Sequence, residues 1–485
     1  MKTSPLAKNH RAAHRAAFWA TRACGVFLLG LLAACRSTPP AAPAGPPPQA
    51  AYVVLGAGGA ATARAIVTTA ACPALRVDGT LAPMGLRAAA GTAAQRSGQA
   101  KASDFPVRVC EAALPAGAAA ASIDGQPLPR VPAQVQRIVV LGDTGCRIKQ
   151  AEQAYQDCSS ASAWPLAAVA AAAAQERPDL VVHVGDYHYR ESLCPPDQVC
   201  AGSPWGYGWD AWDADLFVPA RTLMGAAPWV VTRGNHESCS RAGQGWFRFL
   251  DTGPYEPQRS CDAVADDAAA DYTPPYAVPL GDHWQLIVFD SARATRSLDR
   301  QRPADAQTYD RYSAQMRSVA QLAAAPGMHS IFVSHHPVLG FAIDSGGHLQ
   351  LGTGALLQTL RDTNGPRYFP AGVDLSLHGH VHNFQAIDFL SDHPATLVAG
   401  HGGDKLDRDI PAQIDATYPS AAGVRVHFIA HANRFGYLVL ERAGAAWDVR
   451  ARAVDGALLA HCTLNAAHLD CPQAGALSLP TPPAN

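Results

Sequence analysis

Short runs of hydrophobic and β-branched residues recur along this chain, and several end at a glycine followed by a polar side chain. Three such runs, 137–141 (RIVVL), 179–184 (DLVVHV) and 228–232 (PWVVT), lead into 142–145 (GDTG), 185–189 (GDYHY) and 234–237 (GNHE). Short, continuously apolar runs predict buried parallel strands, and α/β proteins place their chemistry at the carboxyl ends of such strands. We therefore expect Asp143, Asp186 and Asn235 to point out of a sheet at its carboxyl end.

The rest of the chain after residue 137 alternates between strand and helix patterns. Further strands are predicted at 283–290, 329–333, 373–377 and 396–399, and helices at 164–176 and 310–325. The strands at 329–333 and 373–377 lead directly into 334–337 (SHHP) and 379–382 (GHVH). Residues 435–441 and 447–453 alternate like antiparallel strands that close a sheet. The pattern predicts a mixed α/β domain over 133–455 with more than one sheet, followed by a C-terminal tail at 456–485.

The residues before this domain have a different pattern. Between 52 and 132, short apolar pieces are broken by Gly, Pro and Asp, which predicts a small antiparallel β domain. The sequence of this segment contains no cluster of metal-ligand residues. We expect it to pack against the main domain or to shape the substrate site.

The amino terminus is typical of an exported protein. A basic region precedes the apolar segment 25–34, which is too short to span a bilayer and ends in LAAC at 32–35. This arrangement resembles a bacterial lipoprotein signal over 1–35, with cleavage before Cys35 and acylation of Cys35, which anchors the protein to the lipid bilayer. An ordinary secretory signal is the alternative. The Pro- and Ala-rich segment 36–51 would then be a solvated tether. Since Arg36 stands where inner-membrane lipoproteins commonly have Asp, analogy favours the outer membrane, on its periplasmic side.

The cysteine count and the charge balance indicate the cellular compartment and the kind of partner. Of twelve cysteines, ten remain once Cys24 and Cys35 are set aside, and an even set in an exported protein indicates disulfides. Sequence proximity predicts the pairs Cys72–Cys110, Cys146–Cys158, Cys194–Cys200, Cys239–Cys261 and Cys462–Cys471; the absence of CxxC argues against thiolate metal binding. With 38 basic and 40 acidic side chains, no nucleic-acid partner is indicated.

The polar residues after the strands have the chemistry of a two-metal site. Carboxylate and carboxamide oxygens offset the charge of the ions, and neutral imidazoles fill the remaining positions. The candidate ligands are Asp143, Asp186, Tyr189, Asn235, His335, His380 and His382. His380 and His382 are separated by one residue, so an extended segment would send them to opposite faces. We therefore expect a loop at 379–382.

The ordered set GDxG, GDxxY, GNHE, His-x-Pro and GHxH resembles the purple acid phosphatases, within the calcineurin-like metallophosphoesterases. The resemblance implies a four-layer αββα sandwich. It also implies an Fe(III) held by Asp143, Asp186, Tyr189 and His382. Asp186 would bridge to a divalent ion (Fe, Zn or Mn) completed by Asn235, His335 and His380. Many relatives carry a histidine where this chain has Gly145, and here Tyr189 compensates for it.

The same resemblance implies hydrolysis of phosphate monoesters by a hydroxide bound to the two metals, with His236 as the general acid. His336, His348 and His401 are candidate substrate contacts, and Glu237 is expected to order its loop. Two alternatives stay open. One is a phosphodiesterase or nucleotide-cleaving enzyme, because the same metals serve diesters in a wider pocket. The other is a non-catalytic envelope-binding lipoprotein.

Overall fold

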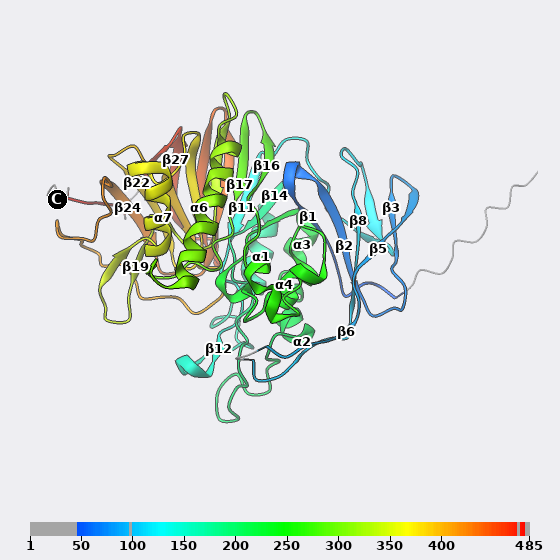
Figure 1. Ribbon diagram of the computed structural model, residues 1–485. Helices are drawn as coiled ribbons and strands as arrows, with labels where there is room; N and C mark the ends of the chain where they lie inside the picture. The colour runs from blue at the N-terminus through cyan, green and yellow to red at the C-terminus, as the bar shows by residue number, and fades with distance from the viewer. Residues whose placement is uncertain (1–45, 97–98, 473–475, 481–485) are drawn as a thin grey trace, which may run out of the picture. The chain divides into compact units, whose positions relative to one another are not determined.

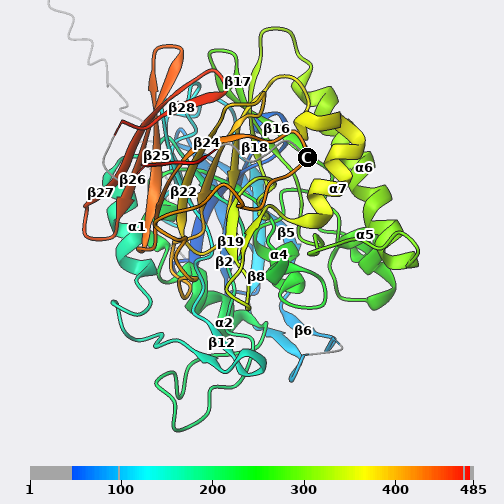
Figure 2. The ribbon, with the colours of Figure 1, turned by 90° about the vertical axis from the view of Figure 1, so that its left-hand side faces the viewer.

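Two large β-sheets and the helices outside them make up most of the protein (Figures 1 and 2). The computed structural model describes residues 46–96, 99–472 and 476–480. The signal segment, the lipidation site at Cys35 and the first part of the predicted tether therefore lie outside the described residues. Within the described part, no helix is both long and apolar enough to cross a membrane.

The first sheet has eleven strands, and parallel strands form its centre. In spatial order they are β28 (His468–Asp470), β27 (Leu458–Asn465), β26 (Ala446–Ala453), β25 (Gly436–Ala443), β11 (Arg137–Leu141), β14 (Leu180–His183), β15 (Trp229–Val231), β1 (Ala50–Leu55), β2 (Ala61–Val67), β8 (Arg108–Ala113) and β5 (Gly85–Ala88). Strands β11, β14, β15 and β1 run parallel to one another. Their carboxyl ends therefore share one edge of the sheet.

The second sheet has eight strands and is built the same way. Its order is β16 (Tyr276–Gly281), β17 (Trp284–Val288), β18 (His329–Val333), β21 (Val373–His378), β23 (Ala395–Ala399), β22 (Phe384–Phe389), β24 (Val426–Ala432) and β29 (Ala476–Ser478). Strands β17, β18, β21 and β23 are parallel. The loops after β18 and β21 are the two histidine motifs.

Alternation along the strands builds four layers. Val140 and Val182 point inward and pack with Leu286 and Leu375 in a core between the two sheets, because successive side chains of a strand face opposite sides. Val139 and Val181 point outward, toward α1 (Leu166–Gln175), α3 (Arg221–Ala226) and α4 (Gly243–Phe249).

On the far side, Ile287 and Phe332 pack against α6 (Pro303–Ala323) and α7 (Gly354–Asn364). Short helices α2 (Trp209–Trp212) and α5 (Asp267–Ala270) lie in connecting segments. The αββα sandwich is therefore confirmed.

Smaller sheets decorate the two large ones. A four-stranded sheet contains β10 (Gln126–Pro127), β9 (Ala121–Ile123), β3 (Ala74–Val77) and β4 (Thr80–Pro83), and three two-stranded pieces are β12 (Ile148–Lys149) with β13 (Ala154–Tyr155), β19 (Phe341–Ile343) with β20 (Leu349–Leu351), and β6 (Gly91–Ala93) with β7 (Ser103–Phe105). The β19–β20 hairpin follows the motif at 334–337 and reaches the cavity described below.

The ends of the main domain differ from the prediction. The strands expected between 52 and 132 are present, but β1, β2, β8 and β5 continue the eleven-stranded sheet, with β1 parallel to β15. Likewise β27 and β28, in the predicted tail, extend the other end of that sheet, and β29 joins the second sheet. Both segments share sheets with the main domain because unpaired edge strands offer backbone hydrogen bonds that a further strand can satisfy.

All five predicted disulfides are present: Cys72–Cys110, Cys146–Cys158, Cys194–Cys200, Cys239–Cys261 and Cys462–Cys471. Each closes a loop of limited sequence separation or joins neighbouring strands. The pairs join consecutive cysteines of the set, as predicted, although Cys72 and Cys110 are 38 residues apart.

Candidate metal centre

The five sequence motifs meet where the parallel strands of both sheets end. The loops after β11, β14 and β15 come from the first sheet, and those after β18 and β21 from the second. Asp143, Asp186 and His380 take left-handed backbone conformations, with φ of 54°, 57° and 68°. Such values are unfavourable for residues that carry a Cβ, and they persist where surrounding structure enforces them, as at functional sites. They turn these side chains out of the strand direction.

One group of predicted ligands surrounds the Tyr189 hydroxyl. This oxygen lies 3.0 Å from Asp143 Oδ1, 2.9 Å from Asp186 Oδ2 and 3.1 Å from His382 Nε2. His382 Nε2 is also 3.2 Å from Asp143 Oδ1. A hydroxyl has one proton and cannot donate to three acceptors at once. The side-chain oxygen or nitrogen atoms of Asp143, Asp186, Tyr189 and His382 therefore converge on one point.

A second group surrounds the Asn235 side-chain oxygen. It lies 3.0 Å from His335 Nε2 and 3.1 Å from His380 Nδ1, and His335 Nε2 is 3.1 Å from Asp186 Oδ2. Ligand atoms of Asp186, His335 and His380 all lie within 4.8 Å of one another. Asp186 thus belongs to both groups, which is the position of a bridging carboxylate.

The charges of this cluster attract cations. Burial opposes protonation of His335, but the Asp186 carboxylate raises its pKa to about 9. Burial likewise opposes protonation of His382, and the Asp407 and Asp404 carboxylates raise its pKa to about 10. Protons and metal ions compete for such sites, and metal binding would release these protons. Two carboxylates, a phenol, a carboxamide oxygen and three imidazoles fit two cations.

Gly145 explains why a tyrosine completes the set. A Cβ built at Gly145 would lie 2.8 Å from the Tyr187 carbonyl oxygen, the Tyr189 amide nitrogen and Asp215 Oδ2. A histidine cannot occupy that position without moving the 185–189 loop. The space is filled instead by the turn that carries Tyr189.

His236 lies beside the cluster. Its ring packs against that of Tyr189, with centroids 3.9 Å apart, and its Nδ1 is 2.7 Å from Glu191 Oε1. Nε2 lies 3.8 Å from Asp186 Oδ2. Burial and the Arg241 guanidinium lower the pKa of His236 to about 4, although Asp186 and Glu191 oppose this.

The cluster forms the floor of an open cavity of about 820 Å³. His336 lines it and packs against His380, with ring centroids 4.2 Å apart and ring planes tilted by 38°. His348 and His401 do not line it. The His348 side chain is 77% exposed on the β19–β20 hairpin, and His401 is fully buried. Their predicted contact with substrate is not supported by these positions, because neither side chain faces the cavity.

Several contributors were missed from the sequence. Glu191 and Arg241 contact His236, and buried Asp404 pairs with Arg147 and lies 3.3 Å from His382 Nδ1. Glu191 directly follows GDYHYR, and Asp404 follows the glycine turn at 400–403, so position relative to the motifs was the available signal. Glu237 has the expected ordering role, since it accepts backbone N–H groups of Asp186, Tyr187, His188 and Gly234.

The family model for calcineurin-like phosphoesterases matches residues 136–384, about half of the chain. The chain belongs to the calcineurin-like phosphoesterase family. It is therefore a metal-dependent phosphoester hydrolase, and the family implies a dimetal centre. None of the curated proteins is similar enough to this sequence to count as a match.

The solved structures that are similar to this chain include the following three. A purple acid phosphatase from yellow lupin (Lupinus luteus) seeds is 16% identical, with 89% of this chain and 74% of that chain covered and a TM-score of 0.49. PhoD is 10% identical, with 89% and 94% covered and a TM-score of 0.49. A dimetal phosphatase from Danio rerio is 10% identical, with 69% and 99% covered and a TM-score of 0.38. The family assignment rests on the match over 136–384.

Proposed function

We propose that this phosphoesterase hydrolyses phosphate monoesters with an Fe(III) and a divalent ion, as purple acid phosphatases do. The observation that carries the proposal is the pair of donor groups joined at Asp186, with a tyrosine hydroxyl in one of them. A deprotonated phenol is a hard anionic ligand that suits Fe(III). When bound, the two cations would activate a water molecule and take up charge on the phosphoryl oxygens.

The residues divide between the two ions. Asp143, Asp186, Tyr189 and His382 would hold the Fe(III). Asp186, Asn235, His335 and His380 would hold the divalent ion, which is Fe, Zn or Mn. The hydrogen bonds and ion pairs described above support this division.

His236 would supply the proton that the leaving oxygen needs. Its Nδ1 is 2.7 Å from the Glu191 carboxylate, and donation to that carboxylate would fix the ring, which lines the cavity. Because burial and the Arg241 guanidinium lower the pKa of His236 to about 4, the imidazole is protonated to a useful extent only at acidic pH, and this role would be confined to that range.

Hydrolysis of phosphodiesters is the second candidate. The cavity of about 820 Å³ extends from the metal ligands to Asp344 and Gln350 of the β19–β20 hairpin, which leaves room for a second ester substituent.

Metal analysis and activity on two substrates test the proposed function and its alternative. The natively purified protein should contain two metal ions per chain, one of them iron, and should release phosphate faster from p-nitrophenyl phosphate than from bis-p-nitrophenyl phosphate. A visible charge-transfer band should be present and be absent in Tyr189→Phe. Faster diester cleavage would favour the second candidate. A protein that releases phosphate from neither ester would refute the proposed substrates, and an active iron-free enzyme would refute only the iron assignment.

We also propose that the mature protein is exported and lipid-anchored through Cys35. The lipoprotein-like segment 25–35 and the Pro- and Ala-rich residues that follow support this. The five disulfides support an oxidising compartment such as the periplasm.

A further inference from the structure

Three arginines lie close to the sequence motifs, and buried carboxylates or carbonyl groups hold all of them. Arg147 donates to Asp404 and Glu152. Arg190 is buried against Asp215. Arg233 donates to the carbonyl oxygens of Glu237 and Ala270 and to Asp271.

Arg190 and Arg233 do not line the cavity, whereas Arg147 does, and all three of its side-chain nitrogens donate to Asp404 or Glu152. These contacts give Arg190 and Arg233 a structural role.

A fourth arginine is placed differently. Arg241 lines the cavity together with Asp186, Tyr189, Asn235 and His236. Its Nη1 donates to the Asn235 carbonyl oxygen at 3.3 Å, and its Nη2 contacts Glu191 and lies 2.7 Å from the His236 ring nitrogens. No hydrogen bond from its Nε is present among the described residues. A guanidinium has five N–H donors, so donors remain for an anion in the cavity.

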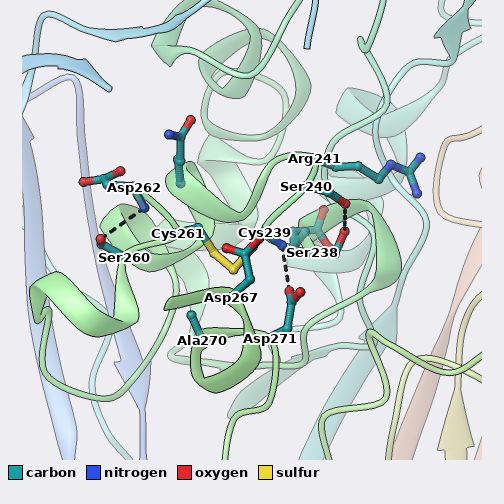
Figure 3. Close-up of a disulfide and its surroundings, with 12 residues drawn as sticks. Ser238, Cys239, Ser240, Arg241, Ser260, Cys261, Asp262, Asp267, Ala270 and Asp271 are labelled. Atoms are coloured by element: carbon teal, nitrogen blue, oxygen red, sulfur yellow. Dashed lines mark hydrogen bonds between the residues drawn. A yellow bond between two sulfur atoms is a disulfide. The ribbon is translucent and has the colours of Figure 1, made fainter. Parts of the chain in front are cut away.

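The backbone around Arg241 is fixed. Cys239, two residues before it, is disulfide-bonded to Cys261, and its amide donates to Asp271 at 2.7 Å. Figure 3 shows the Arg241 side chain extending away from this disulfide. The Arg241 amide donates to the Ser238 carbonyl oxygen, and its own carbonyl oxygen accepts from Gln99. The side chain is therefore held in place before any substrate binds, which lowers the entropic cost of using it.

The carboxylate of Glu191 connects Arg241 with His236. Its side chain is 9% exposed and contacts both Arg241 and His236. Glu191 thereby holds the Arg241 guanidinium and the His236 ring on the same side of the seven candidate metal ligands. A phosphoryl group bound at these candidate ligands would face both the guanidinium of Arg241 and the ring of His236.

From these contacts we propose that Arg241 binds the phosphoryl group of the substrate and favours dianionic monoesters over monoanionic diesters, with Glu191 as its positioning residue. The inference rests on the proposed function and specifies the substrate charge that the same site selects. Charge-assisted hydrogen bonds from arginine to phosphate are strong, and Coulomb attraction scales with the charge of the anion. Arg241 should therefore bind a monoester, which carries a second negative charge, more strongly than it binds a diester.

The test compares Arg241→Gln and Arg241→Lys with wild type on p-nitrophenyl phosphate and bis-p-nitrophenyl phosphate. Loss of the guanidinium should lower kcat/KM for the monoester about 10- to 100-fold, mainly through KM. For the monoanionic diester the loss should be about the square root of that factor, ~3- to 10-fold. Arg241→Lys keeps the charge without the forked donors, so it should retain more of the preference for monoesters. Arg302→Gln is the matched control, because that side chain is 75% exposed and does not line the cavity.

Calorimetric titration of the metal-loaded proteins with orthophosphate is the second readout. Arg241→Gln should bind orthophosphate about 10-fold or more weakly at unchanged metal content. Unchanged orthophosphate affinity, or an equal loss of kcat/KM for both esters, would overturn the proposal. If Arg241→Gln does not fold, the ester ratio of Arg241→Lys decides. If the wild type cleaves neither ester, the proposed function fails, and the orthophosphate titration alone still decides the role of Arg241.

Discussion

Replacing Asp404 by Asn probes the support behind the proposed iron site. Asp404 is fully buried and accepts hydrogen bonds from Arg147, including one of 3.0 Å from Nε. The same carboxylate lies 3.3 Å from His382 Nδ1, although the Lys405 carbonyl oxygen is closer, at 2.8 Å. The Arg147 guanidinium in turn lies over the Tyr189 ring, 4.8 Å from its centroid. Asp404 therefore acts on two proposed ligands through Arg147 and through its charge.

The expected cost follows from these contacts. Removing one partner of a buried ion pair costs about 3–5 kcal/mol, because the other charge is left uncompensated. Here Arg147 keeps Glu152 at 2.7 Å, which is 43% exposed and screened by solvent. Burial raises the pKa of Asp404 to about 6, against the lowering effect of Arg147, so the carboxylate is itself costly to bury. We therefore expect Asp404→Asn to lower the free energy of unfolding by about 2 kcal/mol.

The assay is urea unfolding with disulfides intact, combined with iron titration. Outer partners of metal-bound histidines are worth about 10- to 100-fold in metal affinity, and we expect that loss for iron in Asp404→Asn. The double variant with Arg147→Met should be less destabilised than the sum of the two single variants. Asp299→Asn, at a pair exposed by 75% and 50%, should change stability by less than about 0.5 kcal/mol. Wild-type stability and iron affinity in Asp404→Asn, or strict additivity with Arg147→Met, would refute this reasoning.

Three other perturbations address the proton donor, the loop and the anchor. His236→Asn should lower kcat for poor leaving groups about 100-fold or more and leave phenolic esters less affected; equal effects on alkyl and nitrophenyl phosphates in steady-state kinetics would count against His236 as the acid. Glu237→Ala leaves four backbone N–H groups, 2.9–3.2 Å from the carboxylate, without their acceptor. It should destabilise the fold by about 4 kcal/mol in urea unfolding, whereas an unchanged midpoint would contradict the ordering role. Cys35→Ser should move the protein from the membrane to the soluble fraction on cell fractionation, and continued membrane retention would argue against acylation.

Local pattern was sufficient for much of the fold. The strand predicted at 137–141 coincides with β11, and those at 329–333 and 373–377 match β18 and β21 closely. The residues of an apolar, β-branched run and the glycine after it are enough to predict a strand and the turn that ends it. Helix α7 was not predicted, and α6 begins at Pro303 rather than near 310. Both helices are covered on one side by the second sheet, so tertiary contacts stabilise segments whose own pattern is weak.

The sequence by itself determined the order of the motifs and the chemistry of the seven candidate ligands, because each motif is a short run of adjacent residues. It predicted the disulfide pairs but did not determine them, since Cys72 and Cys110 are 38 residues apart. Only the tertiary structure decided which strands pair across long separations, as when β1 joins β15. It also decided that Arg241 faces the cavity while Arg190 and Arg233 are held by buried partners. Charged side chains look alike in a sequence, and their roles differ only through the partners that the fold brings within hydrogen-bond distance.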